Sequence, residues 1–286
     1  MMPLNKRTSL QVASDEAISY NKEQTASLVL VSGISYLCWK LFQGMSNNHK
    51  NDPFGLAVEA YYKNADNTPI VVASSIAEDE ELFPEYLFRE FDSMPKLEKE
   101  ALKYARASVL DIGAGAGCHS LYLQDQGINV TALELSPLCC EVMKSRQIER
   151  IINGDFMTLT LPKFDTLLLL MNGAGLAGKY ENLPGFISRL KALLNHKGRV
   201  IIDSADMMYM YKDDETEETW IDLNADEYYG EVEYKLSYKD EANATFPWTF
   251  FDPDTLIVGF EEKGFRLIDF FEGDYHNYLC VFDLID

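Results

Sequence analysis

Residues 108–117 read SVLDIGAGAG, and this stretch decides the fold that the sequence predicts. Val109, Leu110 and Ile112 form a short apolar run, which is typical of a strand buried on both faces. Glycines follow the run, and residues 118–127 (CHSLYLQDQG) then predict a short helix. Glycine lets a ligand lie against the main chain, and a helix N-terminus offers unpaired N–H groups. The stretch therefore predicts a strand, a bend and a helix start that together bind a ligand.

The glycine spacing distinguishes between two kinds of nucleotide site. A dinucleotide-binding loop has the pattern G-x-G-x-x-G, in which the third glycine packs the helix onto the strand. Here Gly113, Gly115 and Gly117 give G-x-G-x-G, and Asp111 lies two residues before the first of them. An acidic side chain beside the bend would repel a pyrophosphate but suits an ammonium group. S-adenosylmethionine carries an ammonium and a sulfonium but no phosphate, and the stretch resembles motif I of the class I S-adenosylmethionine-dependent methyltransferases.

The resemblance implies that the cofactor, S-adenosylmethionine, binds at the ends of successive strands. Glu134 ends the next expected strand, where a carboxylate can accept hydrogen bonds from both ribose hydroxyls. NAD-binding proteins share this spacing, so Glu134 alone does not identify the cofactor. Asp155 and Phe156 resemble the adenine-binding element, in which an acid lies beside an apolar wall. The predicted cofactor-binding residues are Asp111, Gly113, Ala114, Gly115, Gly117, Glu134, Leu135, Asp155, Phe156, Asn172 and Arg89.

Strand and helix patterns alternate after the glycine bend. FDTLLLLMNGAG (164–175) predicts a buried strand that ends in a loop of small residues, and residues 182–195 and 199–206 predict a helix and a fifth strand. This alternation indicates a parallel sheet with right-handed crossovers. Together with the resemblance to class I methyltransferases, it implies an α/β, Rossmann-like fold, with a seven-stranded, mostly parallel sheet whose last strand is antiparallel. An N-terminal helical cap and a β-hairpin insertion after strand five complete it.

The chain divides into three expected parts. Residues 1–50 are an N-terminal extension with a short apolar run at 27–39, either a translated leader before a native start at Met45 or a tail that packs or anchors. Residues 51–107 are a helical cap or lid, including helices expected over 78–94 and 95–105. Arg89 is the candidate partner of the cofactor carboxylate; the alternative is that the aromatic residues around it only pack the cap onto the core. Residues 108–286 form the methyltransferase domain, with its insertion at about 206–251.

The insertion combines acidic and aromatic residues. Residues 206–241 hold 13 acidic and three basic side chains, and residues 228–238 and 246–251 predict paired strands. Such a surface can select a cationic amine by charge and by cation–π contact, although the DDETEE run also fits a solvated loop. The substrate-contacting candidates are Asp206, Tyr209, Trp248 and Tyr86, and no catalytic residue is predicted.

Charge and composition exclude several classes of partner. The net charge of -21 disfavours nucleic-acid binding, which needs clustered Lys and Arg. Residues 172–175 (NGAG) also lack the [DN]PP[YFW] motif of enzymes that methylate bases. The five cysteines show no C-x-x-C spacing, which predicts reduced thiols, no metal site and a cytoplasmic location.

The predicted function is transfer of a methyl group from S-adenosylmethionine to a nitrogen, oxygen or sulfur atom of a small molecule. A general base is needed only where the acceptor must first lose a proton. Two alternatives stay open: a cofactor-binding scaffold or sensor without transfer, and an NAD-dependent oxidoreductase, which Asp111 and the glycine spacing disfavour. The sequence predicts neither the acceptor nor the oligomeric state, and no membrane partner is expected unless the run at 27–39 is an anchor.

Overall fold

The computed structural model describes residues 52–212, 228–239 and 242–285. The N-terminal extension, with its apolar run at 27–39, and the acidic DDETEE run at 213–218 lie outside the described residues. Within the described part, no helix has both the length and the apolar character that crossing a membrane requires.

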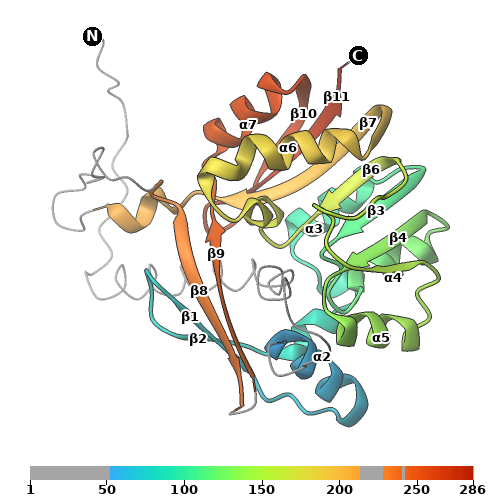
Figure 1. Ribbon diagram of the computed structural model, residues 1–286, viewed down its shortest axis with the longest axis vertical. Coiled ribbons are helices and arrows are strands. Elements are labelled where there is room, and N and C mark those ends of the chain that lie inside the picture. The colour runs from blue at the N-terminus through green and yellow to red at the C-terminus, as the bar shows by residue number, and fades with distance from the viewer. Residues whose placement is uncertain (1–51, 213–227, 240–241, 286) are drawn as a thin grey trace.

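A seven-stranded sheet forms the centre of the molecule, which confirms the predicted fold (Figure 1). Its strand order is β10-β11-β7-β6-β3-β4-β5, and β11 runs antiparallel to both of its neighbours. The pairs that join β7, β6, β3, β4 and β5 are all parallel. The strands are β3 (Ser108–Ile112), β4 (Asn129–Glu134), β5 (Ile151–Asn153), β6 (Phe164–Leu169), β7 (Leu194–Ala205), β10 (Phe265–Glu272) and β11 (Asn277–Leu284).

Helices cover both faces of this sheet, because its central strands are apolar on both sides. Val109 of β3 packs in the cluster formed with α3 and α4, whereas its neighbour Leu110 packs in the cluster on the opposite face, which includes residues of α6 and α7. In Figure 1, α6 and α7 lie side by side along β7, β10 and β11. The helices are α3 (Lys96–Tyr104), α4 (Cys118–Asp125), α5 (Pro137–Ser145), α6 (Leu183–Ala192) and α7 (Pro253–Glu262).

A second sheet joins the N-terminal segment to the insertion after β7. The predicted hairpin is present as β8 (Glu231–Tyr238) and β9 (Ala242–Thr249), and β8 also pairs with β1 (Ile70–Ser74) of the N-terminal segment. β2 (Glu80–Leu82) completes the order β2-β1-β8-β9 (Figure 1). The insertion and the N-terminal segment are therefore one antiparallel sheet.

The prediction of a helix over residues 78–94 is wrong. These residues form β2 and two short 3-10 helices, η3 (Pro84–Phe88) and η4 (Phe91–Ser93). Pro84 lies inside the expected helix, where proline removes a hydrogen bond and forces the preceding residue away from helical angles. Pairing with β1 then stabilises the extended conformation.

The N-terminal segment does begin with a helix, α2 (Pro53–Asn64). Asp52 caps it, because one carboxylate oxygen accepts a hydrogen bond from the Gly55 N–H at 2.7 Å. The other oxygen accepts a hydrogen bond from the Ser136 hydroxyl, beyond the end of β4, at 2.6 Å. This shared carboxylate places the start of α2 against the carboxyl edge of the large sheet.

Replacing Phe282 of β11 by alanine should lower the free energy of unfolding by about 3–5 kcal/mol. Its ring is fully buried and stacks on Phe260 of α7 with a centroid distance of 4.2 Å. Phe270 on the neighbouring strand is 37% exposed, so Phe270→Ala should cost about 1 kcal/mol. Urea denaturation of both variants measures the difference, and equal losses would contradict this packing.

Candidate functional site

The glycine bend lies where the sequence predicts it, between β3 and α4. Gly113, Gly115 and Gly117 have φ angles of 82°, 56° and 85°, in the left-handed region. A Cβ on Gly117 would also lie 2.2 Å from the Ile148 side chain. At this position both the backbone angle and the available space require glycine.

Glu134, at the end of β4, holds this bend. Its Oε2 accepts a hydrogen bond from the Gly115 N–H at 2.8 Å, and its Oε1 accepts one from the Ser136 N–H at 2.9 Å. The side chain is 2% exposed, and this burial raises the pKa of Glu134 to about 7, against the opposing effect of the two N–H donors. Each carboxylate oxygen keeps a second lone pair that can accept a further hydrogen bond.

Asp203, on β7, holds the loop that follows β6 in the same way. Its two oxygens accept hydrogen bonds from the Met171 N–H at 3.1 Å and the Gly173 N–H at 2.9 Å. Burial raises the pKa of Asp203 to about 7, although these donors oppose the shift. Met171 and Asn172 have φ angles of 66° and 57°, so the carboxylate fixes two consecutive left-handed residues.

Sequence reasoning missed Asp203. Its signal was present, because Asp203 interrupts the apolar run RVIIDSAD in the way that Asp111 interrupts SVLDI. The strand-end rule that identified Glu134 does not select Asp203, because Asp203 lies two residues before the end of β7 at Ala205.

Asn172 is the polar side chain whose environment is most unusual. It is 2% exposed, and neither Oδ1 nor Nδ2 has a hydrogen-bond partner among the residues that the structure describes. Buried amides are nearly always hydrogen-bonded, because an unpaired polar group loses its hydration without compensation. The Asn172 amide is therefore suited to bind a ligand at the carboxyl end of β6.

A buried network lies beside the start of α4. The Ser120 hydroxyl donates to Asp111 Oδ2 at 2.7 Å, and His119 Nε2 lies 2.8 Å from Glu98 Oε2. Burial raises the pKa of Asp111, which the charge of His119 partly offsets. Burial opposes the charged form of His119, but the neighbouring Cys118 and Glu98 hold its pKa well above the usual value.

Arg89 belongs to this network, and its main partner is a residue that sequence reasoning missed. Its Nη2 lies 2.7 Å from both carboxylate oxygens of Glu98, and its Nη1 donates to the Tyr86 carbonyl at 2.8 Å. Burial opposes ionisation of Glu98, but the charges of His119 and Arg89 hold its pKa below the usual value. The guanidinium also lies 4.2 Å from the centre of the Tyr86 ring. Glu98 therefore fixes the orientation of the Arg89 guanidinium before any ligand binds.

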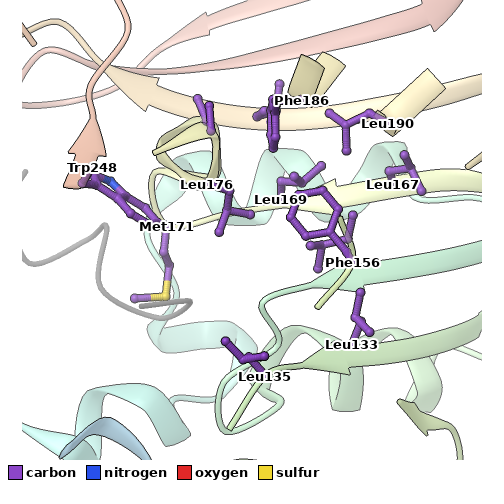
Figure 2. Packing of buried hydrophobic residues seen from close by; sticks show 14 of the residues in the cluster. Leu133, Leu135, Phe156, Leu167, Leu169, Met171, Leu176, Phe186, Leu190 and Trp248 are labelled. Carbon is purple, nitrogen blue, oxygen red and sulfur yellow. The ribbon is translucent and has the colours of Figure 1, made fainter. Parts of the chain in front are cut away.

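Asp155 and Phe156, the predicted adenine-binding pair, lie in different surroundings. Asp155 is half-buried and accepts hydrogen bonds from the Met157 N–H at 2.8 Å and the Thr158 hydroxyl at 3.1 Å. The Phe156 ring is fully buried and meets Phe186 edge-to-face at a centroid distance of 5.9 Å. Figure 2 shows this ring among the leucines of the core. The Phe156 ring therefore packs in the core, and its place beside the adenine stays a prediction.

Two of the substrate candidates have buried polar atoms without a partner in the described residues. Trp248 of β9 packs on η5 (Gly173–Ala177) so closely that a Cβ on Gly175 would lie 2.1 Å from its indole nitrogen. Tyr209 lies on η7 (Met207–Tyr211), the 3-10 helix that follows β7. In the described part of the chain, neither the Trp248 N–H nor the Tyr209 hydroxyl, both buried, has a partner.

The remaining candidates have structural partners. Asp206 caps η7 by accepting a hydrogen bond from the Met208 N–H, and it accepts another from the Tyr229 hydroxyl, both at 2.9 Å. Tyr86 is half-buried, and its ring lies against the Arg89 guanidinium. Burial raises the pKa of Tyr86 to about 12. Ala114 and Leu135 are buried beside the bend, where the Leu133 carbonyl accepts a hydrogen bond from the Ala114 N–H at 3.2 Å.

Comparison with known proteins identifies the class of this fold and site. Residues 110–202 match the model of a methyltransferase domain family. A crystal structure of an S-adenosylmethionine-dependent methyltransferase from Bacteroides fragilis, in complex with S-adenosylhomocysteine, is 35% identical, with a TM-score of 0.75 over 83% of this chain and 96% of that one. The chain therefore belongs to the S-adenosylmethionine-dependent methyltransferases. This confirms the predicted class of enzyme and its cofactor, S-adenosylmethionine.

Two more distant proteins are similar to part of this chain. A cypemycin N-terminal methyltransferase from Streptomyces sp is 27% identical over 103 residues, which span 35% of this chain and 42% of that enzyme. The match thus covers less than half of its length. The CcbJ methyltransferase from Streptomyces caelestis is 15% identical, with a TM-score of 0.50 over 68% of this chain and 91% of that one, and it shares the fold.

Replacing Gly117 by alanine should destabilise the protein more than the same change at Gly127. Both glycines have positive φ, which costs an alanine about 1–2 kcal/mol, but only Gly117 faces a crowded neighbourhood. A Cβ on Gly127 would meet no atom within 4 Å, so this variant isolates the backbone cost. Chemical denaturation compares the two, and equal effects would show that Ile148 does not limit the bend.

The stability of the unliganded protein should fall as the pH rises from about 4.5 to about 7. The folded-state pKa of Glu134 exceeds its unfolded value, so the stability linked to its proton is present below the unfolded pKa and is lost as the pH rises through about 7. A neutral Glu134→Gln variant should therefore gain stability relative to the native protein across this window, by about 3 kcal/mol. Unfolding curves at several pH values test this, with exposed Glu141→Gln as the control. Parallel pH profiles for the native protein and Glu134→Gln would contradict it.

Proposed function

We propose that this chain transfers the methyl group of S-adenosylmethionine to a nitrogen, oxygen or sulfur atom of a small molecule. Family membership gives the cofactor, and the acidic composition argues against a nucleic-acid acceptor, since the net charge is -21. The site supports the choice of methyl acceptor and of the residues that bind it and the cofactor.

The residues around the glycine bend fit the cofactor. Glu134 retains lone pairs for the two hydroxyls of a ribose, and the bend carries no side chain at Gly113, Gly115 or Gly117. Glu98 orients the Arg89 guanidinium, whose Nη1 donates one hydrogen to the Tyr86 carbonyl. The second N–H of Nη1 can donate to a ligand. We assign Glu134 to the ribose and Arg89 to the carboxylate of the amino-acid part.

The observation that carries the proposal is the buried Asn172 amide, which has both polar atoms without a partner among the described residues. Asp203 fixes the backbone on both sides of it, so its direction is set before any ligand binds. When bound, S-adenosylmethionine supplies a methyl group already activated by the sulfonium. The chain then has to align the acceptor and exclude water, which the fixed Asn172 and the cover of the second sheet provide.

Replacing Glu134 by glutamine should weaken S-adenosylmethionine binding about tenfold. The amide keeps one acceptor oxygen but loses the charge that strengthens hydrogen bonds from the ribose hydroxyls, a loss of about 1.4 kcal/mol. Calorimetric titration measures the dissociation constant, and the exposed Glu141→Gln should leave it unchanged. An unaltered affinity in Glu134→Gln would mean that the ribose binds elsewhere.

Turnover tests the transfer itself. The native protein is incubated with S-adenosylmethionine and a panel that holds an amine, a phenol and a thiol, and release of S-adenosylhomocysteine is followed. We expect acceptor-dependent release, reduced at least about tenfold in Asn172→Ala because an orienting amide is lost. Cofactor binding without any acceptor-dependent release would instead favour the scaffold or sensor alternative.

A further inference from the structure

The inner face of the second sheet, defined as the alternate residues of β1, β2, β8 and β9 that point away from solvent, carries one charged side chain among its described residues. The strand registers place Glu80 opposite Val72, and Val72 opposite Leu236, so all three share this face. The inner face consists of Ile70, Val72, Ser74, Glu80, Leu82, Val232, Tyr234, Leu236, Tyr238, Ala242, Ala244, Phe246 and Trp248.

Two tyrosines lie near Glu80. Tyr209 of η7 and Tyr234 of β8 both lie close enough for the Glu80 charge to act on their hydroxyls, and burial together with this charge raises the pKa of each phenol. The Tyr234 ring lies 5.9 Å from that of Phe246, which in turn lies 6.5 Å from Trp248. Trp248 packs on Gly175, so this line of rings runs from Glu80 to the loop of Asn172.

The polar atoms along this line are suited to a ligand. The Tyr209 hydroxyl and the Trp248 N–H are buried and have no partner in residues 52–212, 228–239 and 242–285, and the same holds for the Asn172 amide. The Glu80 Oε2 atom is buried as well. A carboxylate among aromatic faces favours a cation, because both the charge and the ring quadrupoles attract it. A neutral phenol or thiol can donate a hydrogen bond to the carboxylate but lacks the positive charge that both attract.

We infer that the methyl acceptor is an amine whose ammonium form is recognised by Glu80 between Tyr209 and Tyr234. This inference rests on the proposed function and names its substrate class. In the transfer, the ammonium first releases a proton to water, and the neutral nitrogen attacks the methyl carbon. A nitrogen–carbon bond forms, the carbon–sulfur bond breaks, and its electron pair stays on sulfur. The products are S-adenosylhomocysteine and the methylated ammonium.

The test compares two probes of equal shape, 2-phenylethylamine and 2-phenylethanol, which differ in the charged group. Each is titrated calorimetrically, near neutral pH, into the full chain saturated with S-adenosylhomocysteine. We expect the amine to bind about tenfold more tightly than the alcohol. Glu80→Gln should abolish this preference, whereas Glu81→Gln, on the exposed face of the same strand, should keep it.

The outcomes separate this inference from the proposed function. Failure of S-adenosylhomocysteine to bind the native protein would contradict the proposed function itself. Normal binding of S-adenosylhomocysteine without a preference for the amine, or a preference that persists in Glu80→Gln, would overturn the amine inference alone. If Glu80→Gln does not fold, Tyr209→Leu serves in its place, and it should lower the preference about threefold by removing a ring. A preference unchanged in a folded Tyr209→Leu would also overturn the inference.

Discussion

Buried carboxylates that accept main-chain N–H groups hold the functional edge of this protein together. Glu134 of β4 accepts from Gly115 in the bend after β3, and Asp203 of β7 accepts from Met171 and Gly173 in the loop after β6. In the strand order β7-β6-β3-β4, each outer strand thus holds the loop of the inner strand beside it. Both loops contain left-handed residues, which such contacts can stabilise. The shape of the site therefore depends on two charges kept away from water.

The second sheet depends on the same edge. Its strands come from the N-terminal segment and from the insertion after β7, so neither part of the chain forms it alone. Trp248 meets the loop that Asp203 holds, while Asp52 at the start of α2 is bonded to Ser136, which also donates its N–H to Glu134. The second sheet and the N-terminal segment are in this way connected to both Glu134 and Asp203. Residues at such a junction can change without changing the central sheet.

The sequence predicted the parts of the site that depend on neighbouring residues. The positions of the glycine bend, Asp111, Glu134 and Asn172 were predictable because buried apolar runs mark the strands, and parallel strands bring their ends to one edge. Their roles toward the cofactor stay predictions. Glu98, which orients Arg89 and His119, was not found, because its importance arises from burial against distant segments. An acid on a predicted helix gives no such signal when read alone.

The differences between the expected and the observed structure have equally specific causes. β1 becomes a strand because β8, more than 150 residues later, offers it hydrogen-bond partners, and β2 pairs in turn with β1. Local propensity does not contain that pairing. Phe156 follows Asp155 as the resemblance requires, but its side chain turns into the core, a choice set by packing against Phe186. The amine preference that we infer involves Glu80 of β2, whereas the sequence suggested the acidic insertion.

The most direct measurement of the central claim is a crystal structure of this chain with S-adenosylhomocysteine bound. The account predicts both ribose hydroxyl oxygens within about 3 Å of the Glu134 carboxylate, and the Asn172 amide hydrogen-bonded to the ligand. A ribose held by other residues, with the Asn172 amide still lacking a partner, would contradict it.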